Sequence, residues 1–303
     1  MSCWRVWLQW TDFNTDLNKL KTNQPSFKKL FRDWLLGHTY IRFSFFLIFM
    51  TSYYNNFESI GKEAMEALNS MLDREVRFEV TGMGADGTAT KVPDKICEDI
   101  LIDRVKEQDL PFNIVSEEVG VVDRGYGDCI VVDPLDGTYN ALNGIPFYSI
   151  SIATMGSDFT SLNSGFIMNL SNGDIYYSEK GHGVSKNGKP MFPARTGSHI
   201  INIGRGPDPF TAKILEMGGR RRILGCASLE MALVATGSAD LVSYMSPESR
   251  IRNIDVAAGT AMIREAGGQV LDSDHKPLNM GLDVTVRGKF YASCHMDLLE
   301  ELR

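Results

Sequence analysis

The apolar residues from position 55 onward change their period several times, and each change predicts a new element of secondary structure. Apolar residues recur every three or four positions in segments 55–71 and 93–108, which predicts two helices. Pro93 favours a helix that begins there, because proline suits the first helical turn. Short apolar runs predict strands, and polar glycine-rich runs predict loops. We expect strands at 76–80, 113–116 and 129–132, a flexible loop at 81–91 and a short helix from Thr138.

After residue 147 the pattern is strongly β, and from about residue 190 strands alternate with helices. The expected β segments are 148–155, 163–169, 173–178 and a hairpin at 181–189. The later expected strands are 200–203, 222–224, 240–244, 268–271 and 290–292, and the helices are 209–217, 228–236, 255–266 and 296–302. This order predicts an α/β protein with two lobes, residues 53–189 and 190–303.

Residues 1–52 differ from the rest and are treated as an atypical N-terminal extension. They contain all four tryptophans and an apolar run at 43–50. That run is too short to span a bilayer and lies too far from the start for an ordinary signal peptide. Three interpretations stay open: a translated upstream segment before a start at Met50, an extension packed on the domain or a partner, or a weak interfacial anchor.

Composition narrows the class of protein. The chain has 303 residues, of which 43% are hydrophobic and 23% charged, as in globular proteins. Its net charge of −7 disfavours a general nucleic-acid binder, which needs a basic face. The five cysteines are scattered and form no Cys-x-x-Cys pair, so free thiols in a reducing cytoplasm are expected.

The stretch 131–138 carries the strongest chemical signal. Two carboxylates, Asp133 and Asp136, follow a buried strand and are separated by Pro134, which forces a sharp turn. Gly137 permits close approach of the backbone to a ligand, and Thr138 can begin a helix whose free N–H groups can bind an anion. Two carboxylates this close repel unless a cation lies between them. A divalent metal that holds a phosphate oxygen would satisfy this arrangement.

Other acids stand at comparable places. Glu117 follows a predicted strand, and Asp255 begins a predicted helix. Together with Asp133 and Asp136 they offer four hard oxygen donors with no histidine or cysteine beside them, which favours Mg²⁺ or Mn²⁺ over zinc. The chain has no Gly-x-Ser-x-Gly nucleophile elbow. Metal-activated water is therefore the simplest nucleophile.

A literal Gly-x-Gly-x-x-Gly run at 82–87 offers an alternative class, a dinucleotide-binding oxidoreductase. In such proteins the helix begins inside the motif, but here the next predicted helix begins only at Pro93. The preferred interpretation is a flexible active-site loop that presents Asp86.

The chain from about residue 55 to 303 resembles the inositol monophosphatase family, especially its archaeal branch of inositol monophosphatase and fructose-1,6-bisphosphatase type. The matching motifs are Val-Ser-Glu-Glu at 115–118, Asp-Pro-Leu-Asp-Gly-Thr at 133–138 and Ile-Asp-Val-Ala-Ala-Gly at 254–259. Gly-Cys-Ala-Ser at 225–228 and Glu-Ala-Gly-Gly at 265–268 match secondary features. The resemblance implies an alternating α-β-α-β-α sandwich of the sugar-phosphatase type and a phosphoric monoester hydrolase.

The resemblance also implies roles for individual residues. Two or three Mg²⁺ ions, with Mn²⁺ as an alternative, would be held by Glu117, Asp133, the carbonyl of Leu135, Asp136 and Asp255. Asp86 and Thr138, with Glu117, would form the catalytic group that activates water. The expected substrate-binding residues are Asp136, Gly137, Thr138, Gly225, Ala227, Arg252 and Asp255.

The implied reaction is Mg²⁺-dependent hydrolysis of a phosphate monoester of a small polyol or sugar, inositol 1-phosphate first and fructose 1,6-bisphosphate second. Tyr244 stands where animal members place a glutamate that contacts inositol, and Arg205, Arg250 or Arg252 could meet a second phosphate. A 3′,5′-bisphosphate nucleotidase and a member without catalysis are the alternatives within the family. A cytoplasmic homodimer is expected, with no nucleic-acid partner and no membrane span.

Overall fold

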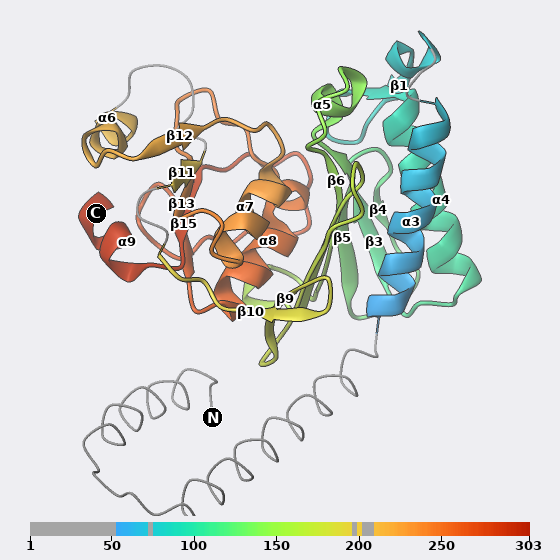
Figure 1. The fold of residues 1–303 in the computed structure, drawn as a ribbon. Helices are drawn as coiled ribbons and strands as arrows, with labels where there is room; N and C mark the ends of the chain where they lie inside the picture. Colours follow the sequence, from blue (N-terminus) through green and yellow to red (C-terminus); the bar gives the residue numbers. More distant parts are fainter. Residues whose placement is uncertain (1–52, 72–74, 196–198, 202–208) are drawn as a thin grey trace, which may run out of the picture. The chain divides into compact units, whose positions relative to one another are not determined.

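The larger of the two main sheets has eight strands in the order β10-β9-β8-β7-β6-β5-β3-β4 (Figure 1). The computed structural model describes residues 53–71, 75–195, 199–201 and 209–303. β3 and β5 are parallel, and the other neighbouring strands are antiparallel. The strands are β3 (Asn113–Ser116), β4 (Gly120–Val122), β5 (Cys129–Asp136), β6 (Ser149–Met155), β7 (Ser164–Asn169), β8 (Ile175–Glu179), β9 (Gly183–Lys186) and β10 (Lys189–Met191).

Two helices, α3 (Tyr54–Met71) and α4 (Val92–Glu107), cover one face of this sheet (Figure 1). Phe57 of α3 packs edge-on against Phe166 of β7, with ring centroids 5.9 Å apart. A Cβ on Gly61 would lie 2.6 Å from the sulfur of Met168, so glycine lets α3 approach the sheet closely. The helical spacing of apolar residues in α3 therefore corresponds to the face that it buries.

The opposite face of the sheet is covered by α7 (Ala227–Ala235) and α8 (Asn253–Glu265). A Cβ on Gly165 of β7 would lie 2.5 Å from the carbonyl oxygen of Ala258, so α8 lies almost against the strand. All residues of α8 from 253 to 263 are buried. A helix enclosed on all sides has no polar face, which explains why both α7 and α8 are apolar around most of their circumference.

A second sheet lies beyond α7 and α8, with the strand order β12-β11-β13-β15-β14. Its strands are β11 (His199–Ile201), β12 (Arg220–Arg222), β13 (Leu241–Tyr244), β14 (Gln269–Leu271) and β15 (Phe290–Ser293). Helices α6 (Pro209–Glu216) and α9 (Met296–Leu302) pack on its outer face around Leu241 and Tyr291. The layers are therefore α-β-α-β-α, and the predicted fold class is confirmed.

The remaining elements are short. They are the 3₁₀ helices η1 (Glu75–Phe78) and η2 (Phe159–Ser161), the hairpin of β1 (Val80–Met83) and β2 (Ala89–Lys91), and helix α5 (Thr138–Leu142). The strand predicted at 76–80 is wrong, because η1 occupies most of it and β1 begins only at Val80. The loop predicted at 81–91 contains most of the hairpin, and β4 was not predicted. Short edge strands carry too few buried residues to produce a clear period.

Residues 56–303 form one compact unit. The predicted lobe boundary between residues 189 and 190 falls inside β10, and the division into two lobes stays a prediction. The extension 1–52 lies outside the described residues, and so do Cys3 and the four tryptophans. Cys97, Cys129, Cys226 and Cys294 are free thiols. Within the described part of the chain, no helix is both long and apolar enough to cross a membrane.

Candidate active site

Four carboxylates from separate segments meet around one guanidinium group, that of Arg252. The group, called here the acid cluster, consists of Asp86, Glu117, Asp133 and Asp255. Arg252 Nη1 lies 2.7 Å from Asp86 Oδ2 and also pairs with Glu117. Arg252 Nη2 lies 2.8 Å from Asp255 Oδ1 and 3.9 Å from Asp133 Oδ2. The structure thus brings together three of the four acids of the predicted metal set and adds Asp86.

Strand pairing explains why these acids converge. β3 and β5 are parallel neighbours, and Ser116 is in register with Val132. The next residues, Glu117 and Asp133, therefore lie side by side at the same edge of the sheet. Asp255 lies in the first turn of α8, where its Oδ2 accepts a hydrogen bond from the backbone N–H of Arg252 at 2.7 Å. This capping contact holds the arginine and the acid together.

Asp136 is buried and faces α7. Its Oδ2 accepts hydrogen bonds from the backbone N–H of Ser228 at 2.7 Å, the hydroxyl of Ser228 at 2.6 Å and the thiol of Cys226 at 3.2 Å. The expected sharp turn at Pro134 is not found: β5 continues to Asp136, and its pairing with β6 is only irregular between Asp133 and Asp136, as in a β-bulge. Asp136 therefore connects the end of β5 to the beginning of α7.

Thr138 pairs with a different acid from the one that we expected. Its hydroxyl lies 2.7 Å from Asp94 Oδ1 and 2.9 Å from the carbonyl oxygen of Leu135. Asp94 lies in the first turn of α4 and is 8% exposed. Asp86, the expected partner, instead bonds Thr88 and the guanidinium of Arg252. Asp86 and Thr138, which we expected to act together on the attacking water, therefore bond different partners.

Gly137 lies where the end of β5 packs closely against the segment before α7. Its φ is +85°, and a Cβ there would lie 3.1 Å from Cys226 Cβ and 3.3 Å from the carbonyl oxygen of Gly225. Both the backbone conformation and the available space therefore require glycine. Ala227, the first residue of α7, directly follows Cys226, so the expected substrate-binding residues 137, 225 and 227 lie on adjoining turns.

Burial and mutual repulsion shape the electrostatics of the site. Burial raises the pKa of Asp133 well above its usual range, and the charges of Glu117 and Asp136 add to this. Burial likewise raises the pKa of Glu117 to about 7 despite the opposing Arg252. Asp86 differs: burial opposes ionisation, yet hydrogen bonds from Thr88 and the charge of Arg252 bring its pKa below the usual value. Asp86 is thus a poor proton acceptor.

The oxygen donors of the site are of the type that a hard divalent cation needs. Carboxylate and carbonyl oxygens are the preferred ligands of Mg²⁺, and the acid cluster gathers four carboxylates around Arg252. A second positive charge touches one of them, because Arg287 Nη2 lies 3.1 Å from Asp86 Oδ2. Among the described residues, no three His, Cys, Asp or Glu side chains already form a metal-binding group. The residues fit a cation by their chemistry, and Arg252 supplies the positive charge in this conformation. We expected Arg252 to meet a substrate phosphate, but its guanidinium is engaged with these acids.

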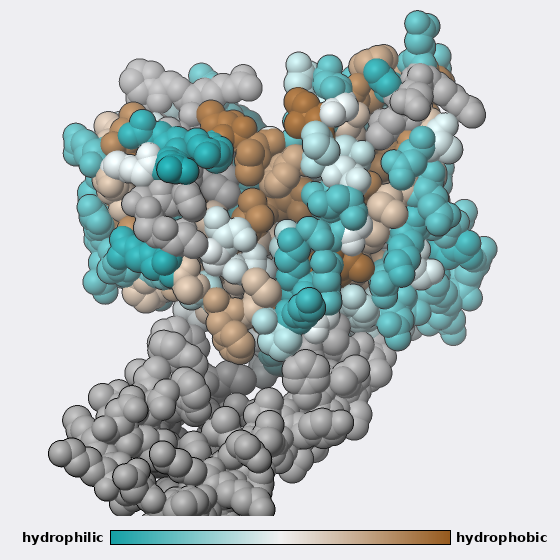
Figure 2. Space-filling model, viewed as in Figure 1, coloured by the Kyte–Doolittle hydropathy of each residue, from teal (hydrophilic) through white to brown (hydrophobic). Residues whose placement is uncertain are grey.

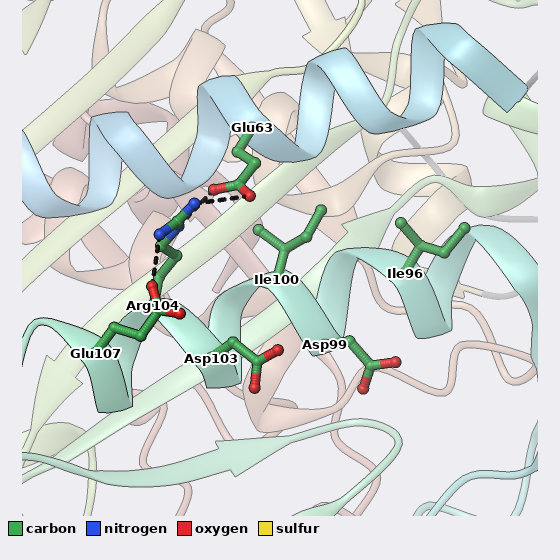
Figure 3. Close-up of a pocket in the computed structure, with 7 residues that line it drawn as sticks. All are labelled: Glu63, Ile96, Asp99, Ile100, Asp103, Arg104 and Glu107. Carbon is green, nitrogen blue, oxygen red and sulfur yellow. Dashed lines mark hydrogen bonds and ion pairs between the residues drawn. The ribbon is translucent and has the colours of Figure 1, made fainter.

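The surroundings of the site differ from the outer surface of the molecule. Figure 2 shows hydrophobic residues gathered between α5 and the segment around α7, whereas the outer surface of α3 and α4 is mostly hydrophilic. A separate cavity of about 260 Å³ lies between α3 and α4 (Figure 3). Its lining includes four acids and Arg104, which pairs with Glu63 and Glu107. None of the predicted site residues lines this cavity.

The fold and the site define a layered α/β protein with a carboxylate-rich centre at the ends of β3 and β5 and the beginning of α8. The family model described as "Inositol monophosphatase family" matches residues 50–302. A fructose-1,6-bisphosphatase/inositol-1-monophosphatase of Archaeoglobus fulgidus is 35% identical over 254 residues, covering 80% of this chain and 95% of the relative. The solved structure of an inositol monophosphatase-fructose 1,6 bisphosphatase matches with a TM-score of 0.72 at 27% identity, covering 83% and 98% of the two chains.

A further relative is described as a bifunctional NADP phosphatase/NAD kinase of Methanococcus maripaludis. It is 32% identical over 270 residues, covering 80% of this chain and 47% of the relative. This chain belongs to the inositol monophosphatase family and is a phosphoric monoester hydrolase. The Gly-x-Gly-x-x-Gly run lies within the β1–β2 hairpin, not between a strand and a helix, so the motif lacks the context of a dinucleotide site.

Two buried acids, Asp94 and Glu230, were not among the residues predicted from the sequence. Asp94 lies in the first turn of α4, where an acid is ordinarily an exposed capping residue, but in the structure it is buried. Glu230, fully buried in α7, gave no sequence signal because glutamate in a helix is ordinarily solvated. Only the folded chain shows that both are enclosed.

Proposed function

We propose that this protein hydrolyses a phosphate monoester of a small polyol or sugar in a Mg²⁺-dependent reaction. Inositol 1-phosphate is the first candidate substrate and fructose 1,6-bisphosphate the second. The observation that carries the proposal is the convergence of the acid cluster on a positive charge, next to a buried Asp94–Thr138 pair. Family membership supports the reaction class.

Two or three Mg²⁺ ions, or Mn²⁺ in their place, would be held by Glu117, Asp133, the carbonyl of Leu135, Asp136 and Asp255. When bound, they would neutralise charge on the phosphate and on the leaving oxygen and lower the pKa of water. The side chains of Glu117, Asp133 and Asp255 would have to exchange Arg252 for these ions. The donor chemistry supports this assignment, and no coordination geometry is implied.

Asp94 and Thr138 are proposed to remove the proton from the attacking water. Asp94 accepts the hydroxyl proton of Thr138, which leaves the lone pairs of Thr138 Oγ1 available to the water. The proton would pass from the water to Thr138 as Thr138 transfers its own to Asp94. Burial raises the pKa of Asp94, partly opposed by the Thr138 bond, and this strengthens it as a base. Asp94 thus replaces Asp86 in the role that we first assigned.

The substrate would lie across the turns that contain Gly137 and Gly225. Backbone N–H groups at Gly137 and Thr138 would contact the phosphate, while Asp136, Asp255 and the segment 225–227 would face the polyol or sugar. The close contact of Gly137 with Gly225 supports this placement. A cytoplasmic homodimer remains part of the proposal.

A third candidate substrate is NADP. The similarity to the Methanococcus maripaludis relative, described as a bifunctional NADP phosphatase/NAD kinase, favours testing it. A 3′,5′-bisphosphate nucleotidase activity is tested in the same series.

The experiment is phosphate release from inositol 1-phosphate, fructose 1,6-bisphosphate, NADP and adenosine 3′,5′-bisphosphate, with Mg²⁺ and with EDTA. Asp133→Asn removes a buried acid shared by the proposed ion sites and should lower kcat at least about 10³-fold, a loss of about 4 kcal/mol of transition-state stabilisation. Asp123→Asn, at an acid outside the site, is the control. Equal rates for Asp133→Asn and the unmodified protein would refute the mechanism, and no release from any substrate would refute the function.

A further inference from the structure

Glu230 is a fully buried carboxylate that lies outside the proposed metal set. It belongs to α7 and accepts three hydrogen bonds. Its Oε1 accepts the backbone N–H groups of Leu224 at 2.8 Å and Gly225 at 3.1 Å. Its Oε2 accepts the hydroxyl of Tyr244 at 2.6 Å. Burying a carboxylate is costly unless donors compensate it, and these three donors offset part of that cost.

The two backbone donors belong to the turn between β12 and α7. Gly225 has a φ of +79°, a conformation that other residues rarely adopt. Glu230 holds the N–H groups of this turn, and Asn140 of α5 holds its other side by donating to the carbonyl oxygen of Leu224 at 2.7 Å. The turn is therefore fixed between two helices, with the carbonyl of Gly225 directed at the close contact with Gly137.

Tyr244 holds the Glu230 carboxylate in place. It lies at the end of β13, and its ring stacks on Phe290 of β15 with centroids 5.3 Å apart and an interplanar angle of 17°. A stacked ring on a sheet strand has little freedom, so its hydroxyl is held at a defined point. The second sheet thus holds Tyr244, Tyr244 holds the Glu230 carboxylate, and Glu230 holds the turn at Gly225.

We propose that Glu230 and Tyr244 are positioning residues that set the affinity of the site for the polyol or sugar part of the substrate. They act by holding the Leu224–Gly225 turn against Gly137 and touch no reacting atom. This inference rests on the proposed function, in which the segment 225–227 faces the substrate alcohol. Loosening the turn should weaken substrate binding without changing the chemistry at phosphorus.

The test compares kcat and KM for the best polyol or sugar phosphate with those for p-nitrophenyl phosphate, whose aryl group lacks hydroxyls. Tyr244→Phe removes one hydrogen bond to a charged group and keeps the stacked ring. It should raise KM for the polyol phosphate about tenfold and change kcat less than about twofold. KM for p-nitrophenyl phosphate should not change. Tyr177→Phe, at a buried tyrosine of β8 that bonds Glu179, is the matched control and should change neither constant.

Glu230→Gln and Glu230→Ala supply a second measurement. The Gln side chain keeps an oxygen that can accept the N–H groups of Leu224 and Gly225, so its increase in KM should be smaller than that of Ala. If Glu230→Ala fails to fold, Tyr244→Phe still decides. An unchanged polyol-phosphate KM in Tyr244→Phe, or an equal increase for both substrates, would overturn the inference. If the unmodified protein releases phosphate from neither substrate, the proposed function fails instead.

Discussion

Replacing Arg252 by methionine should destabilise the metal-free protein and strengthen its binding of divalent cations. Arg252 is the only group in contact with all four acids of the cluster among the described residues. Its side chain is 15% exposed, and the side chains of Asp86 and Asp133 are 0% and 2% exposed. Methionine fills similar space without the charge, so Glu117, Asp133 and Asp255 would be left to repel one another, while Asp86 would keep its ion pair with Arg287 at 3.1 Å.

The size of the effect follows from this geometry. A charge pair 4 Å apart is worth about 4 kcal/mol at an effective dielectric constant of about 20, and the cost of burying the charges offsets much of this. Removing one partner of a buried pair typically costs about 3–5 kcal/mol. For a domain of this size each kcal/mol lowers Tm by about 2–4 °C, so Tm should fall by roughly 6–20 °C.

The assay is thermal unfolding of the unmodified and Arg252→Met proteins in EDTA and in Mg²⁺. Divalent ions replace the missing positive charge, so the difference in Tm should shrink when Mg²⁺ is added. Mn²⁺ binding, followed by electron paramagnetic resonance, should tighten at least about tenfold, because the ion no longer competes with the guanidinium. Both measurements are independent of catalysis.

Arg250→Met is the matched control, since Arg250 is exposed and donates to the carbonyls of Pro247 and Ser249. It should leave both quantities unchanged. The reasoning would be refuted if Arg252→Met were as stable as the unmodified protein in EDTA and bound Mn²⁺ no more tightly.

Three further predictions concern other parts of the site. Asp94→Asn should lower kcat about 10²–10⁴-fold, as expected for loss of a general base, and should leave Mn²⁺ affinity unchanged. Asp86→Asn should lower kcat less. A larger loss in Asp86→Asn than in Asp94→Asn would restore Asp86 as the residue that activates water. Burial raises the pKa of Glu230 to about 7, above its unfolded value of about 4.3, so its contribution to stability is present at low pH and is lost as pH rises through 7. Urea unfolding in EDTA should therefore show that Glu230→Gln loses less stability than the unmodified protein between pH 4.5 and pH 8. The difference should be at most roughly 3 kcal/mol. An equal dependence of unfolding free energy on pH in both proteins would contradict this pKa. Cys226→Ala should change kcat less than about threefold, because burial raises the pKa of this thiol well above its usual range and keeps it unreactive. A large loss of phosphate release would contradict this and show that activity depends on the contact of Cys226 with Asp136.

The local sequence pattern was sufficient to predict a helix or strand whose apolar residues follow a clear period within that element. Helical spacing predicted α3, and the run of β-branched residues before Asp133 predicted β5. The parallel pairing of β3 with β5 then makes it a geometric consequence that Glu117 and Asp133 are neighbours. Acids at strand ends could therefore be grouped before the structure was known, because the carboxyl ends of parallel strands meet at one edge.

Contacts between segments far apart in the sequence could not be predicted from local pattern. Arg252 and Asp86 are separated by 166 positions, and Thr138 and Asp94 by 44. No local period relates such residues, so the sequence alone could not show that Arg252 pairs with Asp86 or that Thr138 bonds Asp94. The burial of Glu230 depends likewise on packing against a turn and a strand outside its own helix.

The sequence by itself determined the alternation of helices and strands and the set of hard oxygen donors, because these depend on residue type and local period. Its motifs indicated the layered fold and the class of reaction through their resemblance to a known family. Only the tertiary structure decided which acid holds Thr138, where Arg252 lies and what supports the turn at Gly225. Those features depend on contacts between segments far apart in the chain, and such contacts exist only after the chain has packed.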